Sequence, residues 1–141
     1  MVEKQKIQGL VEEFIKWTGL FLVSVKVSNA NRIIVLGDKN EGIKIDECAA
    51  IHRHIENGLD NETEDFELQV SSPGLDAQFT VMEQFYKNDG RKVEVTDNEG
   101  SKYIGNLKNV TKGGFELETK LKLLSFNFEQ IKSTRVILTI K

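Results

Sequence analysis

The sequence contains a single cysteine, Cys48, and a single proline, Pro73, in 141 residues. One cysteine cannot form an internal disulfide, and alone it cannot hold a metal cluster. No run of about 18 apolar residues is present, so no transmembrane helix is predicted. The first residues, MVEKQKIQGL, also lack the apolar stretch of a secretory signal. We therefore expect a cytoplasmic protein whose cysteine is buried and inert.

Charge is unevenly distributed along the chain. Residues 1–78 hold 8 Lys and Arg against 14 Asp and Glu, whereas residues 79–141 hold 11 against 8, so the net charges are −6 and +3. An acidic half attracts basic proteins and repels phosphates, while a weakly basic half tolerates phosphates without binding RNA tightly by charge alone. The two halves are expected to meet different partners, unless both are simply solvated faces.

The first half predicts the element order α-β-β-α-β. Apolar residues recur at helical spacing from Ile7 to Ile15 and again from Cys48 to Leu59, and alternating apolar residues predict three strands. Asp46 is expected to be the N-cap of the second helix. The hairpin and the last strand predict a three-stranded sheet with both helices on its apolar face. The expected elements are helices over residues 3–17 and 47–57 and strands over residues 20–28, 32–36 and 66–71.

The second half changes to short β elements. A short helical stretch over residues 79–86 precedes five short strands, which are separated by turn signals such as Asn98-Glu99-Gly100 and Lys112-Gly113-Gly114. This pattern predicts a small closed barrel of SH3-like or Sm-like type, because closure protects the sheet edges. The strands are expected over residues 92–96, 103–107, 115–118, 121–124 and 136–140, with a further turn over residues 126–130.

The proline lies where the two kinds of element meet. Residues 70–76 read VSSPGLD and follow an alternating strand. Proline favours an extended backbone at the residue before it, and a following glycine suits a type II turn, so the strand is expected to end in a sharp reversal. We interpret this segment as the junction between two domains, residues 1–78 and 79–141. Its residues are Ser71, Ser72, Pro73, Gly74, Leu75, which can fill an apolar gap, and Asp76, which can cap a following helix.

Three groups of side chains resemble catalytic or metal-binding residues, and each has a simpler explanation. Asp46 and Glu47 with Asp76 suggest a carboxylate pair for acid–base work or Mg²⁺, but helix capping explains both aspartates. Ser71 and Ser72 lack the strained Gly-x-Ser-x-Gly elbow of a nucleophile, so their hydroxyls are expected to bond to the turn backbone. His52 and His54 lie about 200° apart around the predicted helix, so they cannot easily share one metal ion, and His54 is expected to face solvent. Glycine-rich phosphate loops are absent. We assign no catalytic residue, cofactor or metal.

Four motifs resemble the bacterial ribosome maturation factor family RimP. VSSPGLD at the end of a strand is the strongest of them. One departure is Ala77-Gln78-Phe79, where the family usually has Arg-Pro-Leu. The other three motifs are Gly42 to Cys48, which reads GIKIDEC and precedes the second helix, Gly90 to Val95 after Phe85, and Phe128-x-x-Ile131-x-x-x-Arg135.

The resemblance implies a fold and a function. The fold is an α+β arrangement with a KH-like N-terminal domain and a small SH3/Sm-like C-terminal β-barrel. The function is non-enzymatic binding to the immature 30S ribosomal subunit and promotion of its late assembly. The implied partners are rRNA and a basic ribosomal protein of the decoding region, with no membrane and no small-molecule substrate. We expect a monomer.

The nucleic-acid contacts are expected in the second half. A KH fold usually clamps RNA with a Gly-x-x-Gly loop, and this sequence has none. The basic residues of the second half, interleaved with Tyr86 and Tyr103, have the composition of an RNA contact, although an exposed lysine can also serve only solubility. The candidate rRNA or protein contacts are Arg91, Lys92, Lys102, Lys108 and Arg135, with Lys87 and Lys112 in the same group.

Two other functions are compatible with part of this pattern. A general RNA-binding module of KH and SH3 type would bind short unstructured RNA tightly and in a salt-sensitive manner, and the net acidity argues against it. An enzyme on an α/β scaffold would need a convergent set of titratable groups, which the sequence does not offer.

Overall fold

The computed structural model describes residues 2–60, 64–74 and 77–137. The chain forms two compact units, Met1–Pro73 and Gly74–Lys141, so the division falls inside the VSSPGLD segment. The domain boundary that we place after residue 78 remains a prediction. Among the described residues, no helix has the length and apolar character needed to cross a lipid bilayer.

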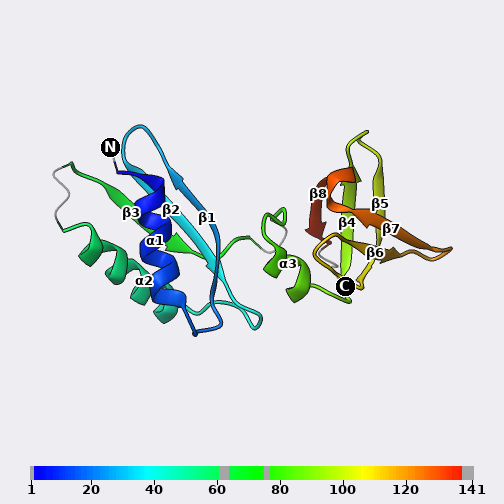
Figure 1. Ribbon diagram of the computed structural model, residues 1–141, viewed down its shortest axis with the longest axis horizontal. Helices are drawn as coiled ribbons and strands as arrows, with labels where there is room; N and C mark the ends of the chain where they lie inside the picture. Colours follow the sequence, from blue (N-terminus) through cyan, green and yellow to red (C-terminus); the bar gives the residue numbers. More distant parts are fainter. Residues whose placement is uncertain (1, 61–63, 75–76, 138–141) are drawn as a thin grey trace. The chain divides into compact units, whose positions relative to one another are not determined.

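The first unit has the predicted α-β-β-α-β order and is KH-like (Figure 1). β1 and β2 form an antiparallel hairpin, and β3 pairs in parallel with β2, so the sheet order is β1-β2-β3. The connection between the parallel strands β2 and β3 contains α2, as such crossovers usually do. The elements are α1 (Lys4–Ile15), β1 (Phe21–Val27), β2 (Arg32–Asp38), α2 (Ile45–Gly58) and β3 (Glu67–Ser71).

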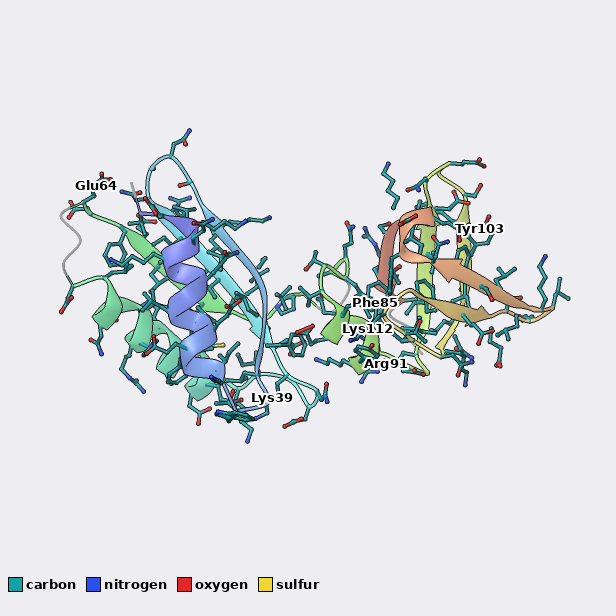
Figure 2. All side chains as sticks on the ribbon, viewed as in Figure 1. Lys39, Glu64, Phe85, Arg91, Tyr103 and Lys112 are labelled. Carbon is teal, nitrogen blue, oxygen red and sulfur yellow. The ribbon has the colours of Figure 1, made fainter. Side chains whose placement is uncertain are left out.

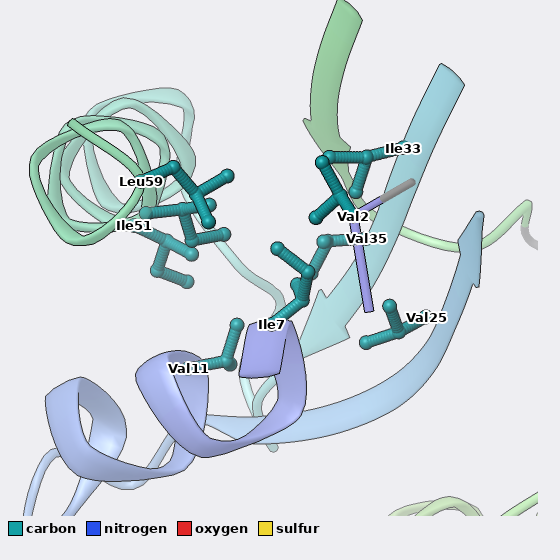
Figure 3. Packing of buried hydrophobic residues seen from close by; sticks show 9 residues of the cluster. Val2, Ile7, Val11, Val25, Ile33, Val35, Ile51 and Leu59 are labelled. Atoms are coloured by element: carbon teal, nitrogen blue, oxygen red, sulfur yellow. The ribbon is translucent and has the colours of Figure 1, made fainter. Parts of the chain in front are cut away.

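Both helices of this unit cover the same face of the sheet (Figure 3). Ile7 of α1 and Ile51 of α2 point toward Ile33 and Val35 of β2, and all four side chains are buried. Each fully buried aliphatic side chain of this kind contributes about 1.5–3 kcal/mol. The apolar spacing in the two helices and the alternation in the strands therefore converge on one core, as predicted.

Two predictions in the first unit are wrong. α2 begins at Ile45 with Lys44 as its N-cap, not at Asp46, because the Glu47 carboxylate reaches back and accepts the Lys44 amide at 2.9 Å. His54 does not simply face solvent: its ring packs against Phe14, with centroids 5.1 Å apart. The His54 Nε2 is buried and has no hydrogen-bond partner among the described residues.

The described residues of the second unit form one short α-helix, one 3-10 helix and a five-stranded antiparallel sheet with the order β7-β6-β5-β4-β8. Its core combines β-branched and leucine side chains with aromatic rings, of which Phe85 packs against Phe79, Phe115 and Phe128. This arrangement agrees with the predicted small barrel. The elements are α3 (Met82–Lys87), β4 (Lys92–Asp97), β5 (Lys102–Lys108), β6 (Gly114–Glu118), β7 (Leu123–Asn127), the 3-10 helix η1 (Phe128–Gln130) and β8 (Ile131–Val136).

Several boundaries in the second unit differ from prediction, and one of them is the start of α3, which is Met82 instead of residue 79. The last strand is Ile131–Val136 instead of 136–140, of which residues 138–140 lie outside the described part of the chain. β7 begins at Leu123 rather than at residue 121, because Thr119 closes a tight hairpin in which its amide donates to the Lys122 carbonyl at 2.9 Å. The predicted turn over residues 126–130 is the end of β7 followed by η1.

Candidate functional site

The junction segment directly follows β3. Ser71 is the last residue of β3 and pairs with Leu36 of β2. Ser72 and Gly74 are exposed and Pro73 is half-buried. The Ala77 amide donates to the Gly74 carbonyl at 3.1 Å. Leu75 and Asp76 lie outside the described residues, and their predicted gap-filling and capping roles remain predictions.

The GIKIDEC motif forms the start of α2 together with the loop before it. Lys39 donates from its Nζ to Glu47 at 2.9 Å and lies 3.5 Å from Glu41 (Figure 2). The buried Asp38 accepts the Ile43 amide at 3.3 Å. The hydrogen bond from Lys39 holds the pKa of Glu47 below its ordinary value and raises the pKa of Lys39. These contacts give the motif a structural role, which is to order the turn that leads into the helix.

The histidine pair serves packing in this structure. The two ring nitrogens of His52 lie 3.1 Å from the Glu56 carboxylate and 3.1 Å from the Leu68 carbonyl, so His52 links α2 to β3. Within residues 2–60, 64–74 and 77–137, no three His, Cys, Asp or Glu side chains are grouped to hold a metal ion. Cys48, which we predict to be buried, is only half-buried, and desolvation followed by the Glu47 charge raises the pKa of its thiol.

Four of the five candidate contact residues lie on one face of the second unit. Strand alternation buries Val93 and Val95 of β4 and Leu107 of β5, and it turns their neighbours outward. The side of the sheet away from the core is called the outer face below. Arg91 directly precedes β4. By the alternation along the strand it falls on the same side as the buried Val93 and Val95, although it is exposed. The outer face carries Lys92, Lys102, Lys108 and Arg135, which come from β4, β5 and β8.

Carboxylates are interleaved with these cations. Lys102 lies 3.6 Å from Glu94, and Glu94 is also directly opposite Arg135 in the β4–β8 pairing. Lys108 is opposite Glu116 in the β5–β6 pairing. Exposed pairs of this kind contribute little to stability, but they lower the positive potential that a phosphate meets. The face is therefore mixed in charge and not a strongly basic patch.

The two tyrosines have different surroundings. Tyr86 on α3 is exposed and can present its ring to a partner. Tyr103 is half-buried: its hydroxyl donates to Asp97 at 3.0 Å, and its ring lies 5.3 Å from that of Phe126 (Figure 2). Tyr103 thus belongs to the β4–β5 hairpin and its packing, and it is not an open stacking surface.

The outer face also carries exposed apolar side chains that the sequence pattern did not reveal. Ile104 of β5 and Leu123 of β7 are about half exposed, and Leu121 at the tip of the β6–β7 hairpin is 94% exposed. In the sequence these residues fall in segments that we predict as short strands, where an apolar side chain is expected to be buried. Only the strand pairing, which shows which side chains of each strand point away from the core, identifies them as surface residues.

Comparison with known proteins relates this arrangement to a family. Residues 10–76 match the family model described as the RimP N-terminal domain. The chain is 36% identical over 118 residues to the ribosome maturation factor RimP of Porphyromonas gingivalis, which covers 84% of this chain and 78% of that protein. The chain belongs to the RimP family.

Other RimP proteins show the same relationship. The ribosome maturation factor RimP of Christiangramia forsetii is 33% identical over 120 residues, covering 84% of this chain and 78% of that protein. That of Flavobacterium psychrophilum is 33% identical over 96 residues, covering 67% and 62%. A similarity over 118 residues is longer than either compact unit, so RimP similarity includes parts of both. The resemblance that the motifs indicated is therefore confirmed.

Proposed function

We propose that this RimP-family protein binds the immature 30S subunit and promotes its late assembly by binding alone. The observation that carries the proposal is the similarity to ribosome maturation factors over a stretch that includes both units. A binding factor promotes assembly when it has a higher affinity for one state of its target than for another. A tenfold preference corresponds to about 1.4 kcal/mol of differential affinity, which a small interface supplies.

The first unit is proposed to contact a basic ribosomal protein of the decoding region. Glu12 and Glu13 of α1 and Glu56 of α2 are exposed, and residues 1–78 carry a net charge of −6. Phosphates are repelled by such a surface, whereas a basic protein is attracted to it. The lack of a Gly-x-x-Gly loop supports the same assignment, because the usual KH clamp for RNA is missing.

The second unit is proposed to contact rRNA through its outer face. Lys92, Lys102, Lys108 and Arg135 lie there, and the exposed Arg91 directly precedes β4. Because Glu94 and Glu116 are interleaved with these cations, binding to arbitrary RNA is expected to be weak. Such a face favours a particular arrangement of phosphates over a high general affinity.

Residues 71–76 are proposed to connect these two binding surfaces. A short connection converts the second contact into an intramolecular event, so two weak contacts together give useful affinity. Loss of either surface is then expected to weaken binding to the particle by more than the intrinsic strength of that surface suggests. The protein is proposed to act in the cytoplasm as a monomer.

Sedimentation with ribosomal particles tests the proposal. The full-length protein is centrifuged through sucrose gradients with mature small subunits or with immature small subunits from cells blocked in assembly. We expect preferential co-sedimentation with the immature particles by about tenfold, and a loss of most of it in the double variant Lys108→Glu/Arg135→Glu. Lys6→Glu/Lys26→Glu makes the same charge change at exposed positions of the first unit and is expected to retain binding.

Two results would contradict this function. Equal co-sedimentation with mature and immature subunits removes the basis for a maturation role. Tight and strongly salt-dependent binding to a short unstructured RNA, with no preference for particles, instead supports a general RNA-binding module.

A further inference from the structure

A groove of about 700 Å³ lies on the outer face of the second unit. It is formed by β4, β5, the end of β6 and the tip of the β6–β7 hairpin. Its apolar walls are Ile104 and Leu121, and its polar rim contains Lys92, Asn106, Glu118 and Lys120. A volume of this size is within the range of ordinary ligand-binding pockets. None of the contacts proposed above for ribosome binding explains its apolar walls.

The apolar side chains around this groove are unusually exposed. Leu121 is 94% exposed at the hairpin tip, Ile104 is 50% exposed, and Leu123, which is opposite Glu118 in the β6–β7 pairing, is 51% exposed. Hydrogen bonds stabilise the conformation of the hairpin tip: the Thr119 hydroxyl accepts the Lys122 amide at 3.1 Å and donates to the Lys122 carbonyl at 2.8 Å. An exposed aliphatic side chain at a hydrogen-bonded hairpin tip, beside a groove with apolar walls, is accessible to a partner.

The charges at the groove indicate the chemistry of its ligand. Lys92 and Lys120 line it and Lys122 follows at the tip, and none of the three forms an ion pair within the described residues, whereas Lys102 is 3.6 Å from Glu94. The Glu118 carboxylate also lies on the rim. Three uncompensated ammonium groups against one carboxylate leave a local excess of positive charge. A ligand that combines an aliphatic group with flanking carboxylates complements both features.

We propose that this groove binds an acidic segment of a partner protein, in which an aliphatic side chain is flanked by carboxylates. Nucleic acid fits less well, because a base needs an aromatic platform and the groove walls are aliphatic. The aromatic rings of Phe79, Phe85 and Phe115 are buried in the core of this unit. The proposed partner has the opposite charge to a basic ribosomal protein, so this inference goes beyond the proposed function. The groove shares Lys92 with the proposed rRNA contacts, whereas Lys120 and Leu121 belong to the groove alone.

Fluorescence anisotropy with the full-length protein tests the proposal. The probe is a fluorescein-labelled synthetic peptide with two adjacent leucines flanked on each side by three aspartates. We expect saturable binding with a Kd of about 100 μM at low salt, weakened at least tenfold when serines replace the leucines. Leu121→Ser and Lys120→Glu are each expected to weaken binding by about tenfold. Ile45→Ser and Lys26→Glu, which change exposed residues of the other unit, serve as matched controls and are expected to leave it unchanged.

Several outcomes would overturn the proposal. These are the absence of saturable peptide binding, unchanged binding by Leu121→Ser, or binding of a ten-nucleotide uridine RNA in preference to the peptide. Self-association in analytical ultracentrifugation that Leu121→Ser abolishes would assign the groove to a second copy of this chain. Leu121→Ser is also expected to co-sediment normally with immature small subunits, which separates failure at the groove from failure of the ribosomal function.

Discussion

Replacing Thr134 by valine is expected to stabilise the second unit. Thr134 lies in β8 opposite Val95 of β4 and is 1% exposed. Its hydroxyl oxygen is buried and has no hydrogen-bond partner among the described residues. The Thr134 backbone carbonyl, in contrast, has a hydrogen-bond partner, because it accepts the Phe79 amide at 2.8 Å. The side chain alone therefore carries an unsatisfied polar group into the core.

The magnitude follows from the desolvation of that hydroxyl. An unsatisfied buried polar group costs about 1–3 kcal/mol, and its replacement by an apolar group of the same shape recovers part of this. Valine keeps the β-branched shape that suits a strand. We expect Thr134→Val to raise the free energy of unfolding by about 1 kcal/mol, which corresponds to an increase in Tm of about 4–8 °C for a unit of this size.

Differential scanning calorimetry measures this change without a local probe. This matters because the single tryptophan, Trp17, lies in the other unit. Thr111→Val is the matched control, since it makes the same chemical change in the same unit at a hydroxyl that donates to the Gly114 carbonyl at 3.2 Å. The control is expected to lower the free energy of unfolding by about 0.5–1.5 kcal/mol. The two substitutions should therefore shift the Tm in opposite directions.

The reasoning is refuted if Thr134→Val lowers the Tm as the control does. That result would mean that the Thr134 hydroxyl makes a hydrogen bond in the folded protein and stabilises the core.

Two further predictions concern β packing and acid stability. A Cβ atom at Gly105 would lie 2.5 Å from the Glu118 carbonyl oxygen, so Gly105→Ala is expected to destabilise the second unit by about 2 kcal/mol or more in urea unfolding. The hydrogen bond from Lys39, followed by that from the Lys44 amide, lowers the pKa of Glu47. Because the folded state favours the ionised carboxylate, this contribution is full near neutral pH and is lost as the pH falls below about 4. Glu47→Gln is therefore expected to destabilise the protein at pH 7 and to show a shallower loss of stability in acid.

Each of these predictions has a clear contrary result. An unchanged urea midpoint for Gly105→Ala would show that β5 and β6 can separate without cost. Equal destabilisation by Glu47→Gln at pH 7 and at pH 3, in thermal unfolding monitored by circular dichroism, would show that the charge of Glu47 is not involved.

Local patterns determined most of the elements of this protein. The apolar spacing of α1 and α2 and the alternation of β1 to β3 are set by which side of each element faces a core, and that information is present in consecutive residues. The change to short strands after the VSSPGLD segment likewise indicated a second, β-rich unit. The family followed from motifs that lie along nearly the whole chain.

Tertiary contacts decided what consecutive residues leave open. The start of α2 depends on Glu47 reaching Lys39 and Lys44, and the packing of His54 depends on Phe14 from another helix. The exposure of Leu121 depends on a hairpin closed by Thr119. Phe14 lies on another helix and Lys39 lies before the loop that leads into α2, so these distances are set only when the chain folds. The same reason explains the outer face of the barrel-like unit: apolar runs look alike whether they point into a core or away from it, and only strand pairing assigns the direction.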